Sequence, residues 1–174
     1  MDEAGAWLAQ ALADRNAAEL QAKSRADSDR CHAIAKCQQA VEKAIKGIIA
    51  ALNNAGIIHQ PIGRQHGVER FWPALIRLPR AGANKEVQLH LHGLLDQNTC
   101  AGIRALDALI PHWPGPGQQF GRNTEYPFQN ADGSWTFPAA PGVFSENEVK
   151  RFRALAHRIV NGAERVVSTL RRRP

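Results

Sequence analysis

The chain has 174 residues, of which 44% are hydrophobic and 22% charged. These values lie near the globular average and exclude a disordered or fibrous chain, and the length suits a single domain over residues 1–174. No apolar run approaches the roughly 20 residues that a membrane-spanning helix needs, so no membrane association is expected. Three cysteines are too few and too uneven for a disulfide framework, and the acidic N-terminus lacks a signal-peptide layout. These features predict a cytoplasmic protein.

The net charge of +6 is concentrated toward the C-terminus. Residues 1–60 carry seven basic and seven acidic side chains, whereas residues 128–174 carry eight basic and four acidic ones. A basic C-terminal third favours a polyanionic partner such as nucleic acid, a nucleotide or an acidic protein. The alternative is that residues 170–174, with three consecutive arginines, form a basic tail that only aids solubility.

Two helices are predicted in the first third of the chain. Residues 4–23 are rich in Ala, Leu and Glu, and residues 28–54 carry an apolar stripe with helical spacing. That stripe consists of Ile34, Val41, Ile45, Ile48 and Leu52. Its breadth predicts a central helix, capped by Asp27 or Ser28 and ended by a left-handed Gly56.

The middle of the chain is less regular. Residues 64–78 predict a third helix, interrupted by Pro73, with Val68, Phe71, Trp72, Leu75 and Ile76 as its apolar side. Residues 79–97 fit either a short strand or a helix. Asn98 or Thr99 is expected to cap a fourth helix that reaches Ile110.

A long segment rich in Pro, Gly and aromatic residues, 111–142, separates this part from the last helix. Its aromatic side chains are expected to be buried, and residues 130–134 predict the turn of a small hairpin. Ser145 and Glu148 form a capping box at the start of the final helix. Its predicted inward stripe comprises Val149, Phe152, Ala156, Ile159, Ala163, Val166 and Leu170. We therefore predict an all-α, up-and-down bundle of four to five helices with a long loop before the last helix.

Three motifs resemble the HEPN family, the "higher eukaryotes and prokaryotes nucleotide-binding" domain. Residues 31–56, CHAIAKCQQAVEKAIKGIIAALNNAG, are similar to its signature segment. Residues 65–71, QHGVERF, resemble the His-containing start of its third helix, and residues 122–127, RNTEYP, resemble its Arg-Tyr-Pro segment. The positions that match the family's pattern are Gln38, Gln39, Glu42, Lys43, Lys46, His66 and Arg122.

The resemblance implies a helical bundle that forms a homodimer and binds nucleotide or RNA, without a cofactor. It further implies a role in a toxin–antitoxin, defence or stress system, often beside a nucleotidyltransferase partner. Many family members are metal-independent RNases that use an Arg followed, after four to six residues, by a His, whereas others have lost that motif.

Two pairs satisfy this loose spacing, Arg25 with His32 and Arg151 with His157. The second pair lies on the predicted final helix, nearer the region that the family uses. His can act as acid or base and Arg can hold a phosphate, so Arg151 and His157 are the candidate catalytic residues. Six residues of helix turn the second side chain by about 240°, so the two diverge within one chain and could converge only in a dimer.

The ligand-binding candidates lie on two helices. Arg151, Arg158, Arg165 and Arg172 recur every seven residues and predict either a phosphate-binding stripe or an ordinary solvated face. Gln38, Glu42, Lys43 and Lys46 are candidates through the resemblance, as are His66 and Arg122. The two lysines are expected to point outward, and Glu42 could instead form a structural salt bridge to a neighbouring helix.

His90 and His92, with Cys100 or His112, lack the spacing of a zinc site, so no metal is expected. The leading hypothesis is a HEPN-like module that binds nucleotide or RNA as a homodimer. The alternatives are a metal-independent RNase toxin and a subunit that docks an acidic protein partner such as a nucleotidyltransferase.

Overall fold

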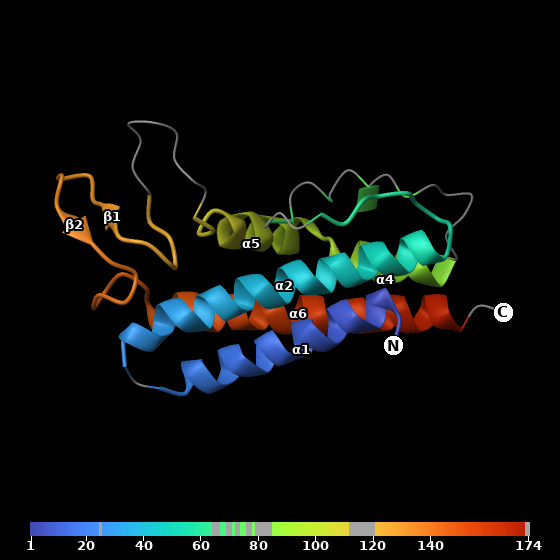
Figure 1. Cartoon of the computed structure of the whole chain (residues 1–174), viewed down its shortest axis with the longest axis horizontal. Helices are drawn as coiled ribbons and strands as arrows, with labels where there is room; N and C mark the ends of the chain where they lie inside the picture. The colour runs from blue at the N-terminus through green and yellow to red at the C-terminus, as the bar shows by residue number, and fades with distance from the viewer. Residues whose placement is uncertain are drawn as a thin grey trace.

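Three long helices form the body of the molecule: α1 (Glu3–Ala22), α2 (Ser28–Asn54) and α6 (Glu146–Arg171). They lie side by side in the computed structural model, and α2 packs against both α1 and α6 (Figure 1). Two shorter helices, α4 (Lys85–Leu94) and α5 (Gln97–Asp107), pack on α6. The structure describes residues 1–24, 26–63, 67–68, 71, 74–75, 78, 85–111 and 121–172. The predicted all-α bundle is confirmed.

Helix α2 is the central helix, as its sequence predicts. Each of its five predicted stripe residues is at most 1% exposed. A wide apolar stripe lets one helix contact partners on two sides, which is why α1 and α6 both pack against it. Gly56, which follows the last residue of α2 by two positions, adopts the left-handed conformation with φ of 66°, as predicted. Its start differs from the prediction, because the Asp27 side chain makes no capping hydrogen bond and pairs with Arg30 instead.

The strand alternative for residues 79–97 is wrong, since residues 85–94 form α4. Residues 79–84 lie outside the described residues. The cap of α5 is also corrected: Asp96, not Asn98 or Thr99, accepts the capping hydrogen bond from the Thr99 N–H at 2.7 Å. An aspartate at this position satisfies an end donor and also places a negative charge at the positive end of the helix.

The predicted helix over residues 64–78 lies largely outside the described residues, as do its members Trp72 and Ile76. Val68, Phe71 and Leu75, from its predicted apolar side, are described and buried. Residues 112–120 of the long segment also lie outside the described residues.

The predicted hairpin is present, with β1 (Phe128–Gln129) antiparallel to β2 (Trp135–Thr136) and Phe128 opposite Thr136. The burial expected for the aromatic side chains of the segment 111–142 is wrong for three of them. Tyr126, Trp135 and Phe137 are 45%, 63% and 55% exposed, whereas Phe128 is buried. The hairpin lies at one end of the bundle and extends away from the helices, so only one face of the ribbon has a partner (Figure 1).

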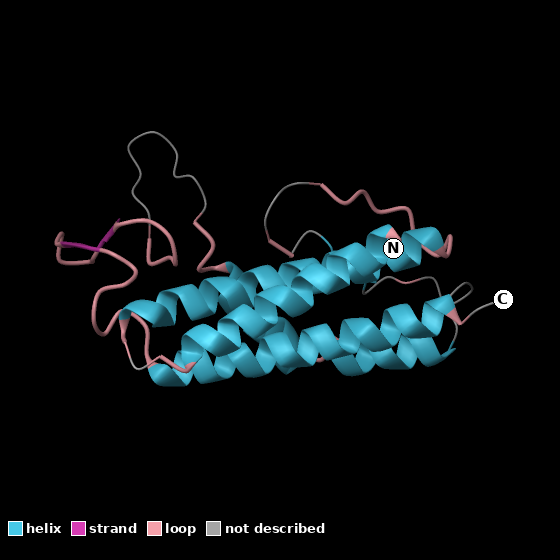
Figure 2. Ribbon diagram, turned by 60° about the horizontal axis from the view of Figure 1, so that its bottom comes forward, coloured by secondary structure: helices cyan, strands magenta, loops and turns pink. Residues whose placement is uncertain are grey.

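Helix α6 begins with the predicted capping box, in which the Ser145 Oγ accepts from the Glu148 N–H and the Glu148 carboxylate accepts from the Ser145 N–H. All seven residues of its predicted inward stripe are buried. Near its other end, Arg171 pairs with Asp2, the cap of α1, and this ion pair brings the two termini to the same end of the bundle (Figure 2). Among the described helices, none combines the length and the apolar character needed to cross a membrane.

Candidate nucleic-acid interface

The outward side of α6 presents a row of arginines. We call this row the arginine face; its members are Arg151, Arg158, Arg165 and Arg172, all exposed. The seven-residue spacing places them on one side of the helix because two helical turns take about seven residues. The buried stripe on the opposite side fixes this orientation toward solvent.

The four arginines differ in how their charge is used. The Arg158 Nη2 donates to the Gly93 carbonyl at 2.8 Å and to the Asp96 Oδ2 at 2.5 Å. The Arg151 guanidinium lies 4.7 Å from the centre of the Phe152 ring. Within the described part of the chain, neither Arg151 nor Arg165 has an acidic partner. Positive charge on this face is therefore mostly uncompensated.

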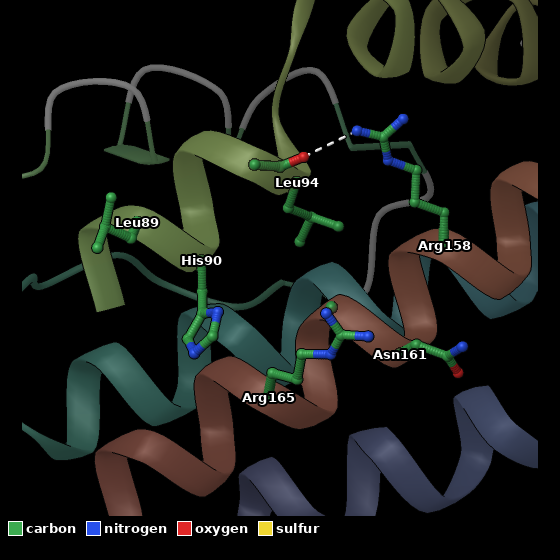
Figure 3. Close-up of a pocket in the computed structure, with 8 residues that line it drawn as sticks. Leu89, His90, Leu94, Arg158, Asn161 and Arg165 are labelled. Carbon is green, nitrogen blue, oxygen red and sulfur yellow. Dashed lines mark hydrogen bonds between the residues drawn. The ribbon is translucent and has the colours of Figure 1, made fainter. Parts of the chain in front are cut away.

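A pocket of about 260 Å³ lies between α4 and α6, beside the arginine face. We call it the α4–α6 pocket. His90 and Arg165 lie on opposite sides of it, and Arg158 lies above them with its guanidinium turned toward the Gly93 carbonyl (Figure 3). The Asn161 side chain, also at the wall, accepts a hydrogen bond from the Arg15 Nη1 of α1 at 2.9 Å.

The electrostatics of the pocket depend on Asp96. The hydrogen bonds from the Thr99 N–H and from the Arg158 guanidinium lower the pKa of Asp96 to about 2. Asp96 is thus ionised at neutral pH and holds Arg158 in place. No acidic side chain is among the residues that line the pocket, although Glu86 lies 3.6 Å from His90 on the same helix.

His157, a candidate catalytic residue, faces α1 rather than Arg151. Its Nε2 lies 3.0 Å from the Glu19 Oε1, and Arg153 pairs with the same carboxylate. The Arg153 hydrogen bond, opposed by burial and aided by His157, lowers the pKa of Glu19, and Glu19 in turn raises the pKa of Arg153. Arg151 instead lines a groove with α5, so the structure does not bring Arg151 and His157 together within one chain.

The candidate ligand residues on α2 make internal contacts. The Gln38 Nε2 donates to the Leu106 carbonyl at 2.7 Å, and the Gln38 Oε1 accepts from the Thr124 hydroxyl at 3.1 Å. These two bonds tie α2 to α5 and to the segment before the hairpin. Because the side chain is only 8% exposed and both ends of its amide are bonded, the contacts favour a structural role for Gln38.

The outward orientation predicted for Lys46 is wrong. Lys46 is 2% exposed, pairs with Glu42 on the same helix, and its Nζ lies 5.0 Å from the centre of the Trp7 ring. A lysine can be buried when its ammonium has a carboxylate and an aromatic face as partners. The salt bridge between Glu42 and Lys46 thus lies within α2.

The outward orientation predicted for Lys43 is also wrong, because Lys43 is half-buried and pairs with Asp14 of α1. Lys36 contacts the same carboxylate at 3.0 Å. Arg122 donates to both oxygens of Glu148, at 2.9 and 3.0 Å, and to the Val143 carbonyl. It therefore fastens residues 121–127 to the start of α6. His66 lies outside the described residues, as do Arg25 and His112. In the described ranges, no group of three His, Cys, Asp or Glu side chains could hold a metal ion.

Sequence reasoning missed Glu19, Arg153 and Asp14. Arg153 and His157 are four residues apart, and this spacing placed both on one face of α6. Their common partner, Glu19, lies 134 residues before Arg153. Nothing in the residues around Glu19 distinguishes this glutamate from other acidic residues on the surface.

Residues 4–77 match a known family model, that of the HEPN domain. The HEPN resemblance drawn from the motifs is thereby confirmed for α1, α2 and the residues up to 77. No curated protein matches the chain, and no solved structure does.

The HEPN match contains the signature segment with Gln38, Glu42, Lys43 and Lys46, and also His66. Arg122 and the whole of α6 lie beyond it. The arginine face and the α4–α6 pocket thus lie outside the segment that matches the HEPN model.

Proposed function

We propose that the chain is a HEPN-like module that binds RNA or nucleotide through the arginine face of α6, as a homodimer. The observation that carries the proposal is the row of exposed arginines beside the α4–α6 pocket, with Arg165 lacking an acidic partner among the described residues. Uncompensated guanidinium groups in a row bind successive phosphates and release counterions, which drives association with a polyanion.

The module comprises residues 1–174 as one domain in this proposal. Its support is the packing of α6 on α1 and α2, because the last helix of the chain completes the core of the matched segment. Cys31, Cys37 and Cys100 are all free thiols, which favours the cytoplasm as the compartment. A role in a toxin–antitoxin, defence or stress system, and a nucleotidyltransferase partner, stay predictions from the resemblance.

Binding is tested by fluorescence anisotropy with a labelled single-stranded RNA. Arg165→Glu is expected to weaken binding about tenfold or more, because a phosphate contact becomes a repulsion. The slope of log affinity against log salt is expected to fall by about 0.7 for each phosphate that the variant no longer neutralises. Arg165 is preferred to Arg158 for this test, since Arg158 also holds Asp96 at the start of α5.

Lys23→Glu is the matched control, because it makes the same change of charge at an exposed residue near the other end of the bundle. The control is expected to bind RNA nearly as well as the unaltered protein. An equal decrease in affinity in the two variants would mean that only net charge matters, and would overturn the arginine face as the site.

The second candidate is a metal-independent RNase, favoured by the contact between His157 and Glu19. A carboxylate that holds one nitrogen of an imidazole fixes the orientation of the ring, as general acid–base catalysis requires. Arg151 does not share this site in one chain, so we propose binding without cleavage. RNA incubated with the protein in EDTA is expected to stay intact. Cleavage that disappears in an identically purified His157→Ala variant would establish the RNase instead.

A further inference from the structure

The α4–α6 pocket has hydrogen-bond donors on several sides. Arg165 contributes a guanidinium from α6 and His90 an imidazole from α4, while the Arg158 guanidinium is turned toward the Gly93 carbonyl (Figure 3). Arginine has only donors, and a guanidinium matches the geometry of phosphate oxygens. Asp96 pairs with Arg158 and Glu86 lies 3.6 Å from His90, but neither carboxylate lines the pocket, and Arg165 has no acidic partner among the described residues. The pocket therefore suits an anion rather than a cation.

The pocket is also held in shape before any ligand enters. A Cβ atom at Gly162 would overlap the Leu94 side chain, so glycine at this position lets α4 approach α6 closely. Arg158 is fixed at two points, by the Gly93 carbonyl and by Asp96. A site whose donors are already placed loses less conformational entropy on binding.

The size of the pocket restricts the ligand. Its volume of about 260 Å³ lies just below the range of about 300–1,000 Å³ that encloses drug-sized molecules. It can therefore take a phosphate group with part of its sugar, while the base stays outside. A phosphomonoester carries about −1.5 to −2 charges at neutral pH, more than the single charge of a backbone phosphodiester.

Resting on the proposed function, we propose that the α4–α6 pocket binds a phosphomonoester group, with Arg165 and His90 as its direct ligands and Arg158 as part of its wall. The terminal phosphate of an RNA strand and the phosphate of a free mononucleotide offer this same group. The arginine face then runs along the following phosphodiesters of an RNA whose end lies in the pocket. The pocket thus selects strand ends, whereas the rest of the face has no preference for them.

The test compares one single-stranded RNA oligonucleotide in three forms, with a 5′-phosphate, with a 3′-phosphate and with hydroxyls at both ends. At least one phosphorylated form is expected to bind about tenfold tighter than the hydroxyl form, the effect of one or two charge-assisted hydrogen bonds. Arg165→Ala and His90→Ala are expected to reduce this ratio to about twofold or less, the remainder coming from the added charge alone.

His92→Ala is the matched control, because His92 is exposed on the same helix and does not line the pocket. It is expected to keep the full preference, and circular dichroism checks that every variant is folded. Equal affinity for all three forms, or a preference that survives in Arg165→Ala, would overturn the pocket assignment while leaving RNA binding by the arginine face intact.

Titration with AMP and with adenosine distinguishes a free mononucleotide from an RNA strand end as the source of the phosphate. It also tests the pocket independently of RNA binding by the arginine face. Binding of AMP but not adenosine, abolished in Arg165→Ala, supports the pocket even if no RNA binds, and then assigns the phosphate to a free nucleotide. A preference for phosphorylated RNA without AMP binding supports the strand end. The absence of both overturns the inference.

Discussion

Asp14 of α1 is a carboxylate buried within the helical body, 3% exposed, with Lys36 and Lys43 of α2 as partners. Burial by itself raises the pKa of a carboxyl group, but here the hydrogen bonds from Lys43 and Lys36 outweigh it, and the pKa of Asp14 lies below its ordinary value. A carboxyl with a lowered pKa in the folded state stabilises the fold above its unfolded-state pKa. That stabilisation disappears as the pH falls through the folded-state pKa.

Asp14→Asn is therefore expected to lower the free energy of unfolding near pH 7 by about 1–3 kcal/mol, because both lysines lose a charged acceptor. At a pH below the ordinary aspartate pKa of 3.8, the gap between the two proteins is expected to narrow as Asp14 becomes protonated. Urea unfolding at both pH values measures this gap. Glu164→Gln, which removes a carboxylate without a partner among the described residues, is the control and is expected to change stability little. A gap that does not depend on pH would contradict the role given to the Asp14 charge.

At the scale of elements, α4 and α6 cross where Gly162 contacts Leu94, and this crossing sets the width of the α4–α6 pocket. Alanine within a helix is favoured over glycine by about 1 kcal/mol, so a Gly-to-Ala change with free space is stabilising. At Gly162 the space is already filled by a buried side chain. The destabilisation caused by overpacking at this position exceeds the stabilisation from the higher helix propensity of alanine.

Gly162→Ala is expected to lower the free energy of unfolding by about 1–3 kcal/mol and to weaken binding of the phosphorylated RNA. The matched control for stability is Gly93→Ala in α4, where a Cβ would meet nothing within 4 Å. Gly93 lines the pocket, so this variant is compared only for stability and is expected to be neutral or slightly stabilising. Thermal unfolding of both variants gives the comparison. Leu94→Ala is expected to lower the free energy of unfolding less in the Gly162→Ala protein than in the unaltered protein, because it removes the overlapping side chain. Strict additivity of the two effects would rule out the steric explanation.

The elements that the sequence predicted well are those whose signals are local. The stripe of α2, the left-handed Gly56 and the capping box of α6 each depend on residues within a few positions of one another. The strand-or-helix ambiguity around Leu89 could not be resolved locally, because a short apolar run fits both periods. The packing of α4 against Gly162 decides it, and that contact joins residues far apart in the chain.

The candidate site shows the same division at the scale of the whole molecule. The spacing of the arginine face could be predicted because a single helix displays it. The burial of Lys46 beside Trp7, the bonds of Gln38 to Leu106, and the opposition of His90 to Arg165 all depend on which helices pack together. Side-chain type alone therefore favoured a solvated Lys46. It connected His90 only with a histidine pattern that lacks the spacing of a zinc site.

The whole molecule is expected to be a dimer in solution. Leu20 and Leu89 are 68% and 64% exposed, and the exposed aromatic side chains of the hairpin add further apolar surface. Sedimentation equilibrium at micromolar concentration is expected to give about twice the chain mass of 19.1 kDa. Leu20→Glu and Leu89→Glu then report which helix lies in the interface, since a buried charge there dissociates the dimer. A mass of one chain throughout the concentration range would refute the dimer.

The ion pair between Asp2 and Arg171 has a consequence for how this chain can be rearranged. Because the two residues are in contact, a short linker could join the ends with a small loop-closure entropy, and new termini could be opened elsewhere. The turn between β1 and β2 is a suitable opening, since it lies at the far end of the bundle from the joined ends (Figure 1). A circular permutant of this kind would keep the arginine face and the α4–α6 pocket unbroken, with the former C-terminal arginines held in a closed loop.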